Sequence, residues 1–309
     1  MPRFEAALGE SLAAEPPSAA GPMTELVGAG GKRLRPALVL LCAKLGEYDL
    51  EQALPAALAV ELLHAATLVH DDVIDRSATR RGRPTVYATR GEAAGILVGD
   101  FHFAKAYREA SRAGAEVVDE LARAVMVICD GELKQQADRY RYRPSEAEYL
   151  ARIQRKTAQL LEAACAVGAL LGGLEGPVEA VLRAYGHHLG LAFQIADDVL
   201  DYTSEEREVG KPVGHDLLEG SATLPLMLAL AHPIVGPELE QLLPEGRPLT
   251  PEQVTRVVDL VRGCGATQEA LARARDIAGH GRRRLEELPS HPAVEAMAAL
   301  ADYVVSRNI

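Results

Sequence analysis

Aromatic and cysteine residues are scarce in this sequence. Among 309 residues there is no tryptophan, aromatic residues make up 4%, and the four cysteines stand far apart without a Cys-x-x-Cys pair. So few aromatic rings argue against a surface that stacks bases or sugars. The cysteine spacing argues against a zinc finger or a disulfide framework. We therefore expect free thiols, packed as small apolar core residues in a reducing compartment.

An excess of positive charge and long apolar runs are also missing. The net charge is −11, which excludes an overall basic surface of the kind that holds nucleic acid. The first residues lack the apolar segment of a signal peptide. Uncharged apolar stretches such as 163–174 are shorter than the roughly 18–20 residues of a membrane span. We predict a soluble cytoplasmic protein with no transmembrane segment and no nucleic-acid partner.

The pattern of proline and apolar residues predicts an all-α fold. Long proline-free tracts cover 85–143, 145–176 and 178–211, and alternation typical of strands is nearly absent. Apolar residues recur at helical spacing, as at Leu54, Leu58 and Leu62. Ser145 followed by Glu148 predicts a capped helix start. We expect one large helical domain over 1–309 with ten or more helices, and loosely held residues at 1–22.

One acidic pattern occurs twice, as Asp71-Asp72-Val73-Ile74-Asp75 and as Asp197-Asp198-Val199-Leu200-Asp201. Each copy follows an apolar helical stretch, and residues four apart on a helix lie side by side. Paired carboxylates repel each other there, and the helix C-terminus adds negative potential. Mg²⁺ removes this conflict, because it binds carboxylates together with water and phosphate oxygens. A solvated helix end explains one such motif well, but the matched pair favours two facing metal sites around a diphosphate.

Basic residues gather near both acidic motifs. The segment Gly30-Gly31-Lys32-Arg33-Leu34-Arg35-Pro36 places three cations before a predicted helix, and Gly210-Lys211-Pro212 follows the second motif. Four arginines follow the first motif, at positions 76, 80, 81 and 83. Glycine amides and guanidinium groups suit phosphate oxygens. A solvated basic run and surface Arg–Asp pairs remain alternatives, as does a structural role for His64 and His70.

Together these motifs resemble the trans-isoprenyl diphosphate synthases, also called polyprenyl synthetases, in their order and spacing. The resemblance covers roughly residues 28–225 and rests on Gly-Lys-Arg-Leu-Arg-Pro at 31–36, the two acidic motifs, Arg80-Arg81, Lys156-Thr157, Phe193-Gln194 and Gly210-Lys211-Pro212.

The resemblance implies a helical bundle with a central cavity, a homodimer and about three Mg²⁺ ions. It further implies head-to-tail 1′-4 condensation of an allylic diphosphate (dimethylallyl, geranyl, farnesyl or geranylgeranyl) with isopentenyl diphosphate. The products would be a longer polyprenyl diphosphate and pyrophosphate.

Roles for individual residues follow from the same resemblance. Isopentenyl diphosphate would be held by Lys32, Arg35, His64 and Arg81. The allylic diphosphate would be held by Arg80, Lys156 and Lys211, with Thr157 and Gln194 beside its reacting carbon. Metal binding would fall to Asp71, Asp75 and Asp197, supported by Asp72, Asp198 and Asp201, and we include Asp198 and Asp201 in the metal-binding set.

Two further positions bear on the substrate and the product. Ser221 stands where the family often has a lysine that contacts the allylic diphosphate, which puts affinity or substrate preference in question. The resemblance also implies that a bulky aromatic residue five positions before the first acidic motif would block a growing chain, and Ala66 stands there. We therefore expect a product longer than fifteen carbons, with Phe101 and Phe103 as a later floor of the cavity.

Three rival functions remain open. A class I terpene cyclase shares the first acidic motif, but it usually carries more aromatic residues and a different second motif. A metal-dependent phosphohydrolase would use His64, His70 and Asp71 and leave the second motif unexplained. A non-catalytic subunit of a heteromeric prenyl synthase usually loses aspartates that are all present here.

Overall fold

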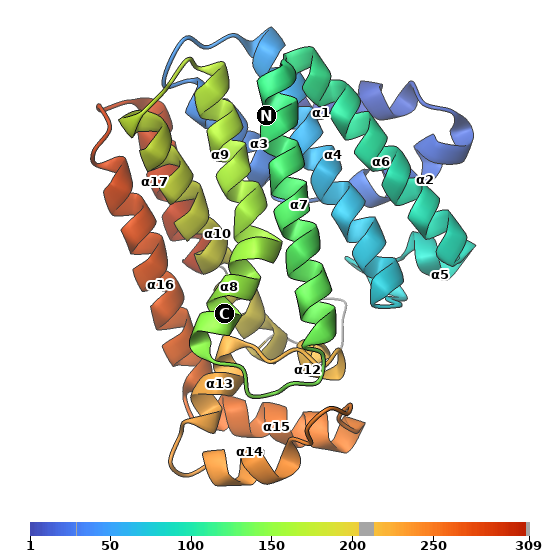
Figure 1. Cartoon of the computed structure of the whole chain (residues 1–309), viewed down its shortest axis with the longest axis vertical. Helices are drawn as coiled ribbons and strands as arrows, with labels where there is room; N and C mark the ends of the chain where they lie inside the picture. Colours follow the sequence, from blue (N-terminus) through green and yellow to red (C-terminus); the bar gives the residue numbers. More distant parts are fainter. Residues whose placement is uncertain (29, 204–212, 307–309) are drawn as a thin grey trace. The chain divides into compact units, whose positions relative to one another are not determined.

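The computed structural model describes residues 1–28, 30–203 and 213–306 (Figure 1). The first helices are α1 (Pro2–Ala13), α2 (Pro17–Gly28), α3 (Leu34–Ala43), α4 (Leu50–Ile74), α5 (Val86–Arg90), α6 (Glu92–Ala113) and α7 (Ala115–Ala137). They are followed by α8 (Glu146–Ile153), the π-helix η1 (Gln154–Ala158), α9 (Gln159–Leu171) and α10 (Pro177–Thr203). The remaining helices are α12 (His215–Leu218), α13 (Leu224–Leu230), α14 (Gly236–Leu242), α15 (Pro251–Gly263), α16 (Ala266–Leu285) and α17 (Pro292–Ser306).

The all-α prediction is confirmed for the described residues. Their only sheet is the pair β1 (Thr79–Arg80) and β2 (Arg83–Pro84), which run antiparallel with Arg80 opposite Arg83. The predicted helix start at Ser145 is also confirmed. The Ser145 side chain accepts from the Glu148 backbone amide, and the Glu148 side chain accepts from the Ser145 amide.

Contacts group the chain into two compact units, and the boundaries between them fall inside α7, α9, α10 and α17 and in the connection between α16 and α17. The first unit comprises Met1–Ala124, Leu160–Arg183 and Ser290–Glu295. The second comprises Val125–Gln159, Ala184–Pro289 and Ala296–Ile309.

Helix α4 forms the core of the first unit. It packs against α6, α3 and α1, and its buried face is rich in alanine, which lets neighbouring helices approach closely. Near the first acidic motif, a Cβ on Gly99 of α6 would lie 2.1 Å from His70 Nε2. A larger residue at position 99 would therefore displace the His70 ring from its present position.

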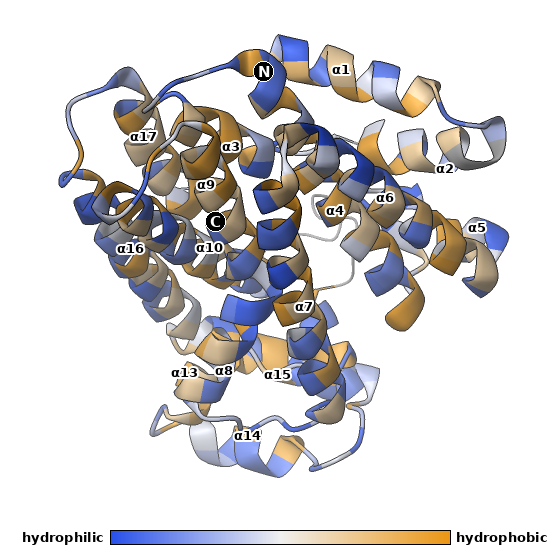
Figure 2. Cartoon of the chain, turned by 45° about the horizontal axis from the view of Figure 1, so that its top comes forward, coloured by the Kyte–Doolittle hydropathy of each residue, from blue (hydrophilic) through white to orange (hydrophobic). Residues whose placement is uncertain are grey.

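Length and composition alone would allow α4 to cross a membrane. However, 72% of its most apolar window is buried inside the protein, as is usual for a core helix. Figure 2 shows that the helices around α4 carry both apolar and polar residues.

The N-terminal residues differ from the loosely held segment expected from the sequence. Residues Pro2–Ala13 form α1, and Phe4, Leu8 and Leu12 on one face of that helix are buried. Their spacing of four residues places them on one stripe, so the burial of apolar area anchors the helix.

All four cysteines are free thiols, as expected. Cys42 and Cys165 are fully buried and Cys264 is partly buried, but Cys129 is exposed on α7. The prediction that every thiol lies in the core is therefore wrong for Cys129, which sits on the outer face of its helix.

An apolar cluster of the second unit joins α10, α12, α13, α14 and α15, with Tyr202, Leu217, Leu226, Leu239 and Val257 among its buried members. Helix α10 is further fixed by the Tyr185 hydroxyl, which donates to the Met297 carbonyl at 2.6 Å. Between α8 and α9 the chain widens into the π-helix η1, a form that occurs mostly as single turns and often at functional sites. The second unit thus presents an irregular turn that carries Lys156 and Thr157.

Candidate active site

The first acidic motif ends helix α4. Asp71 and Asp75 are half-buried, whereas Asp72 is only 3% exposed. Asp72 lies one residue, or about 100°, around the helix from Asp71, so it faces the interior of the unit. There the Arg80 Nε donates to its Oδ1 at 2.8 Å. The motif therefore divides into two outward carboxylates and one inward carboxylate that a protein cation neutralises.

A two-residue turn holds the arginines that follow the motif. Arg81 and Gly82 connect β1 to β2, with φ of 52° and 71°. Positive φ at both central positions is the mark of a tight hairpin turn whose twist matches that of its strands. The turn directs the Arg81 side chain to the Gly30 carbonyl, to which it donates. This hydrogen bond joins the hairpin to the segment around Gly31. Both segments are predicted to bind phosphate.

The three cations of the basic segment before α3 differ in their surroundings. Arg33 adopts a left-handed conformation (φ 49°) at the N-cap of α3, and its side chain is largely buried. Its guanidinium binds Glu61 at 2.7 Å, Glu5 at 2.9 Å and the Val27 carbonyl at 3.0 Å. Arg33 therefore has a structural role, while Lys32 is exposed and Arg35 half-buried.

His64 of α4 lies near this group of cations. Burial lowers its pKa well below the usual value, and the positive charges of Arg35, Arg81, Arg80 and Arg33 lower it further. The imidazole is therefore neutral at pH 7. The first unit thus brings His64, Arg35, Arg80, Arg81 and Asp72 into one electrostatic neighbourhood.

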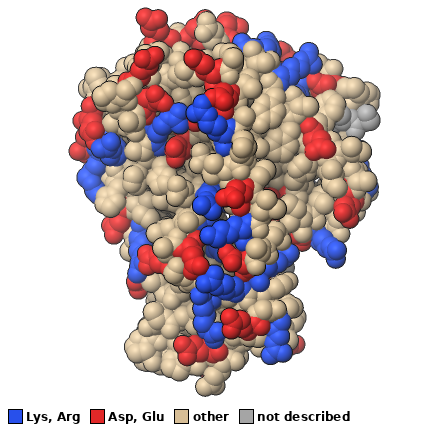
Figure 3. All heavy atoms as spheres, in the orientation of Figure 1, with Lys and Arg blue, Asp and Glu red and all other residues tan. Residues whose placement is uncertain are grey.

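A cavity of about 250 Å³ adjoins the Asp72–Arg80 pair. Its walls are mostly apolar and come from α2, the end of α4, the hairpin and α5, with Leu26, Val69 and Val86 among them. Figure 3 shows acidic and basic side chains intermixed on the face of the molecule in view.

The second acidic motif ends helix α10 and repeats the division found in the first. Asp197 is half-buried and Asp198 is 3% exposed. The Tyr149 hydroxyl donates to Asp198 Oδ2 at 2.7 Å, and Gln194 Nε2 donates to Asp198 Oδ1 at 2.7 Å. Thr157 in the π-helix donates to Gln194 Oε1 at 2.7 Å. Three residues predicted for the site, Thr157, Gln194 and Asp198, therefore form one line of hydrogen bonds.

Asp201 is held from the side of α12. Its two carboxylate oxygens accept from the backbone amides of His215 and Asp216, each at 3.1 Å. Burial, with the nearby Asp216 carboxylate, raises the pKa of Asp198 to about 7 and that of Asp201 to about 8. Crowded buried carboxylates of this kind gain from a cation.

Asp216 and Tyr149 were not foreseen from the sequence. Asp216 lies fifteen residues after Asp201, and only the turn into α12 brings the two together. Tyr149 is a buried aromatic residue on α8, and in the sequence it cannot be distinguished from an ordinary core residue of a helix. No sequence spacing links either of them to the acidic motif.

Three further predicted positions complete the second unit. Lys156 Nζ binds Glu132 of α7 at 2.8 Å, so a diphosphate on Lys156 would compete with this ion pair. Ser221 precedes Ala222, whose carbonyl accepts from Arg152 of α8. Lys211 lies outside the described residues.

The predicted determinants of product length lie in the first unit. Ala66 is fully buried, and so is Leu63, one turn earlier on the same helix, at 1% exposure. A growing prenyl chain that passes Ala66 would therefore require neighbouring side chains to move. Phe101 and Phe103 are half-buried on α6, and the Phe103 ring lies 5.6 Å from that of His70.

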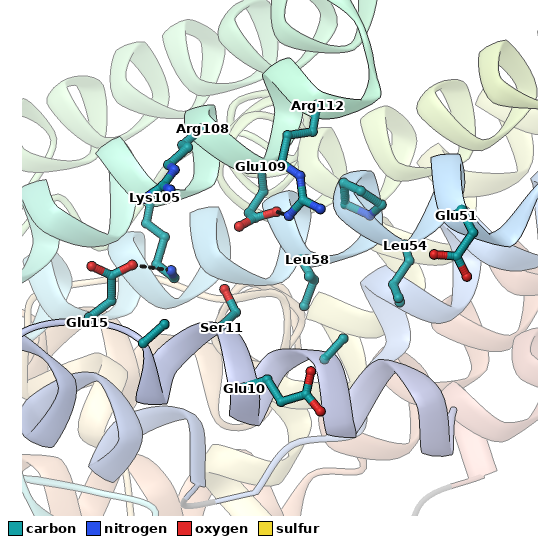
Figure 4. A pocket seen from close by; sticks show the side chains of 13 residues that line it. Glu10, Ser11, Glu15, Glu51, Leu54, Leu58, Lys105, Arg108, Glu109 and Arg112 are labelled. Carbon is teal, nitrogen blue, oxygen red and sulfur yellow. Dashed lines mark hydrogen bonds and ion pairs between the residues drawn. The ribbon is translucent and has the colours of Figure 1, made fainter.

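Another cavity, of about 430 Å³, contains none of these residues. It lies between α1, α4 and α6 in the first unit, beside the ion pairs Lys105–Glu15 and Arg112–Glu109 (Figure 4). Among the described residues no group of three or more His, Cys, Asp or Glu side chains is arranged to hold a metal by itself.

Comparison with known proteins gives the chain its family. Residues 16–261 match the model of the family described as polyprenyl synthetase. The chain is 38% identical over 308 residues to heptaprenyl diphosphate synthase component 2 of Geobacillus stearothermophilus, covering 98% of this chain and 95% of that one. It is 37% identical over 290 residues to octaprenyl diphosphate synthase of Escherichia coli (strain K12), covering 92% and 88%.

A solved structure supports the same assignment. The polyprenyl synthase of Caulobacter crescentus CB15, complexed with calcium and isoprenyl diphosphate, superposes with a TM-score of 0.93 at 38% identity. The superposition covers 99% of this chain and 94% of that one. The predicted fold class and family are thereby confirmed: the chain belongs to the polyprenyl synthetase family and is a prenyltransferase of the prenyl diphosphate synthase type.

Proposed function

We propose that the chain joins an allylic diphosphate to isopentenyl diphosphate by Mg²⁺-dependent head-to-tail condensation, with both acidic motifs serving the same reaction. The observation that carries this proposal is the repeated division of the motif. In each copy the second aspartate is buried and bound by protein donors, while the first is half-buried. A merely solvated helix end would not require the inward residue to be fixed twice.

The donor set suits a hard divalent cation. Asp71 and Asp75 share one helix end, and Asp197 and Asp201 share another, so each pair offers carboxylate oxygens without nitrogen or sulfur ligands. Water and diphosphate oxygens would complete the coordination, as Mg²⁺ commonly allows. The bound ions would neutralise negative charge that develops on the departing pyrophosphate. The calcium in the Caulobacter crescentus relative supports a divalent metal, and Mg²⁺ and its number remain part of the proposal.

The chain's own residues would bind the two diphosphates and hold the reacting carbons together. We assign Lys32, Arg35, His64 and Arg81 to isopentenyl diphosphate, and Arg80, Lys156 and Lys211 to the allylic diphosphate. His64 would act as a neutral hydrogen-bonding group, because its lowered pKa leaves it uncharged. Guanidinium groups bind phosphate oxygens bidentately, and their fixed placement lowers the barrier by orientation and charge.

We further propose a product longer than fifteen carbons. The support is the small side chain at Ala66, together with the names of the heptaprenyl and octaprenyl synthases that this chain resembles. Because Ala66 is fully buried, the growing chain would open its own path between side chains.

The oligomeric state belongs to the same proposal. Met126 and Leu133 of α7 are 72% and 73% exposed, and Cys129 between them is also exposed, which gives an apolar stripe at helical spacing. We propose that a second copy of the chain covers this stripe in a cytoplasmic homodimer. The relative from Geobacillus stearothermophilus is named a component of its synthase, so a different partner chain is the competing assignment.

Product analysis tests the proposal. The purified chain is supplied with Mg²⁺, farnesyl diphosphate and excess labelled isopentenyl diphosphate, and we expect labelled polyprenyl diphosphates beyond fifteen carbons together with pyrophosphate. Asp71→Asn and Asp197→Asn should each lower the rate by at least about 100-fold, the scale of a lost group that stabilises developing charge.

Other outcomes identify the rivals. Consumption of farnesyl diphosphate without uptake of isopentenyl diphosphate would indicate a cyclase, and release of orthophosphate would indicate a phosphohydrolase. No turnover by the chain alone would overturn the proposal in favour of a subunit that needs a partner.

A further inference from the structure

The inward aspartate of the second motif has both its oxygens occupied by uncharged donors of the protein. Asp198 is 3% exposed, and it accepts from Tyr149 on one oxygen and from Gln194 on the other, each at 2.7 Å. In the first motif the matching Asp72 is bound by a cation, Arg80. The second motif thus relies on hydrogen bonds where the first relies on an ion pair.

Tyr149 is a fixed donor. Its side chain is 1% exposed, and the Arg152 guanidinium lies 5.5 Å from the centre of its ring. Burial raises the pKa of the phenol well above its usual value, so the hydroxyl stays protonated near neutral pH. The capping box of Ser145 and Glu148 begins α8 just before Tyr149 and fixes the turn that presents it.

The hydrogen bonds continue from Asp198 to the π-helix. Gln194 donates to Asp198 and accepts from Thr157, which fixes the orientation of its amide. Thr157 adjoins Lys156 in η1, and Tyr149 lies on α8, which leads directly into η1. A line of hydrogen bonds therefore runs through four side chains: Tyr149, Asp198, Gln194 and Thr157. It connects α8 and η1 to the last turns of α10.

We propose that Tyr149 is a positioning residue of this enzyme, whose hydroxyl holds Asp198 inward and thereby sets how Asp197 and Lys156 meet metal and allylic diphosphate. This inference rests on the proposed function. Tyr149 itself touches no reacting atom in this scheme. Groups that orient a metal-binding carboxylate typically change metal affinity or activity about 10–100-fold when they are lost.

Tyr149→Phe tests this role, because it removes one oxygen atom and keeps the volume of the ring. We expect the Mg²⁺ concentration for half-maximal activity and the KM for the allylic diphosphate to rise by roughly 10-fold or more. The KM for isopentenyl diphosphate should stay unchanged, because its proposed ligands are other residues. Calorimetry with farnesyl thiolodiphosphate and Mg²⁺ should show the same loss of affinity without turnover.

Tyr185→Phe is the matched control. It also removes a buried hydroxyl from a hydrogen bond, here to the Met297 carbonyl, but this bond does not involve the acidic motif. We expect wild-type metal dependence in this variant. Equal effects of the two substitutions on metal dependence would show that Tyr149 acts through general stability, and would overturn the proposal.

A double-mutant cycle locates the effect. If Tyr149 acts through Asp198, then Tyr149→Phe should have little additional effect in an Asp198→Asn background, whereas additive losses would contradict this route. If the Phe variant fails to fold, 3-fluorotyrosine at position 149 provides a second measurement. Its ¹⁹F resonance should shift when Mg²⁺ and farnesyl thiolodiphosphate bind, and an unchanged resonance would overturn the proposal.

The two levels of inference fail separately. A wild-type chain that binds Mg²⁺ and the thiolodiphosphate but forms no polyprenyl product overturns the proposed reaction alone. A Tyr149→Phe variant that binds both as tightly as the wild type overturns the role of Tyr149 alone.

Discussion

A single buried histidine on α6 illustrates how one residue affects the stability of the first unit. His102 is fully buried, and its Nδ1–H donates to the Val98 carbonyl at 2.8 Å. Its Nε2 has no hydrogen-bond partner among the described residues. Burial, assisted by the charges of the neighbouring His70 and Lys105 and opposed by the hydrogen bond to Val98, lowers the pKa of His102 to about 4. The folded protein therefore holds a neutral imidazole where an unfolded chain would accept a proton.

This arrangement predicts a loss of stability in mild acid. Between pH 6.5 and 4 the unfolded chain binds a proton at His102 that the folded chain does not, so the free energy of unfolding falls as the pH falls. The expected loss approaches roughly 3 kcal/mol over that range. Chemical denaturation from pH 7 to pH 4.5 measures it. His102→Met removes the titrating group, and parallel curves for variant and wild type would show that His102 is not responsible.

Individual aspartates show what could be foreseen at this scale. The sequence predicts two clusters of carboxylates, but it does not show that Asp72 and Asp198 turn inward, since the donors Arg80 and Tyr149 reach them only in the folded chain. The surroundings of Arg33 could not be foreseen either. The sequence predicts it as one of three phosphate-binding cations, but in the structure its guanidinium binds Glu61 and Glu5. The assignments of the outward residues stay predictions.

Among the elements, the π-helix η1 and helix α10 depend on close contact. A Cβ on Gly190 of α10 would lie 2.4 Å from the Ala158 Cα at the end of η1. Backbone atoms cannot turn aside as a side chain can, so a larger residue would push the two helices apart. The line from Thr157 to Gln194 crosses the same pair of helices, one turn farther along α10.

Gly190→Ala is therefore expected to reduce both stability and substrate binding. Overpacking of this kind destabilises by about 1–3 kcal/mol, and the KM for the allylic diphosphate should rise as the Thr157–Gln194 bond lengthens. Thermal melting and steady-state kinetics measure the two effects. Gly168→Ala is the control, because its Cβ would lie 2.5 Å from the Val39 carbonyl oxygen on another pair of helices. A similar rise in KM in that variant would contradict the explanation.

Helix boundaries were largely foreseeable, because their signals are local. The capping box at Ser145 and Glu148 is present as the sequence predicts. The π-helix was not foreseen. The sequence Gln154–Ala158 is compatible with an ordinary helix, and the hydrogen bond from Thr157 to Gln194 forms only in the folded chain.

For the molecule as a whole, the exposed stripe on α7 predicts self-association. Large apolar side chains that are more than two-thirds exposed, such as Met126 and Leu133, favour burial against a partner. We expect Met126→Lys combined with Leu133→Lys to shift the protein from dimer to monomer. Sedimentation velocity measures the change, and Leu97→Lys on α6, where the residue is 67% exposed, tests whether any exposed leucine has the same effect.

Two results would contradict this expectation. A wild-type chain that sediments as a monomer at micromolar concentration would show that the stripe needs another partner or none. An unchanged dimer in the double variant would place the interface elsewhere on the chain.

The order of synthesis gives helix α4 a further consequence. Its 25 residues resemble a membrane-spanning segment, and α6, which covers it, begins eighteen residues after it ends. A ribosome therefore releases α4 after α1 and α3, which also pack against it, but before α6. Apolar surface of α4 that α6 later covers is exposed during that interval, and exposed apolar surface favours aggregation, so early pairing of α4 with α6 would protect the nascent chain.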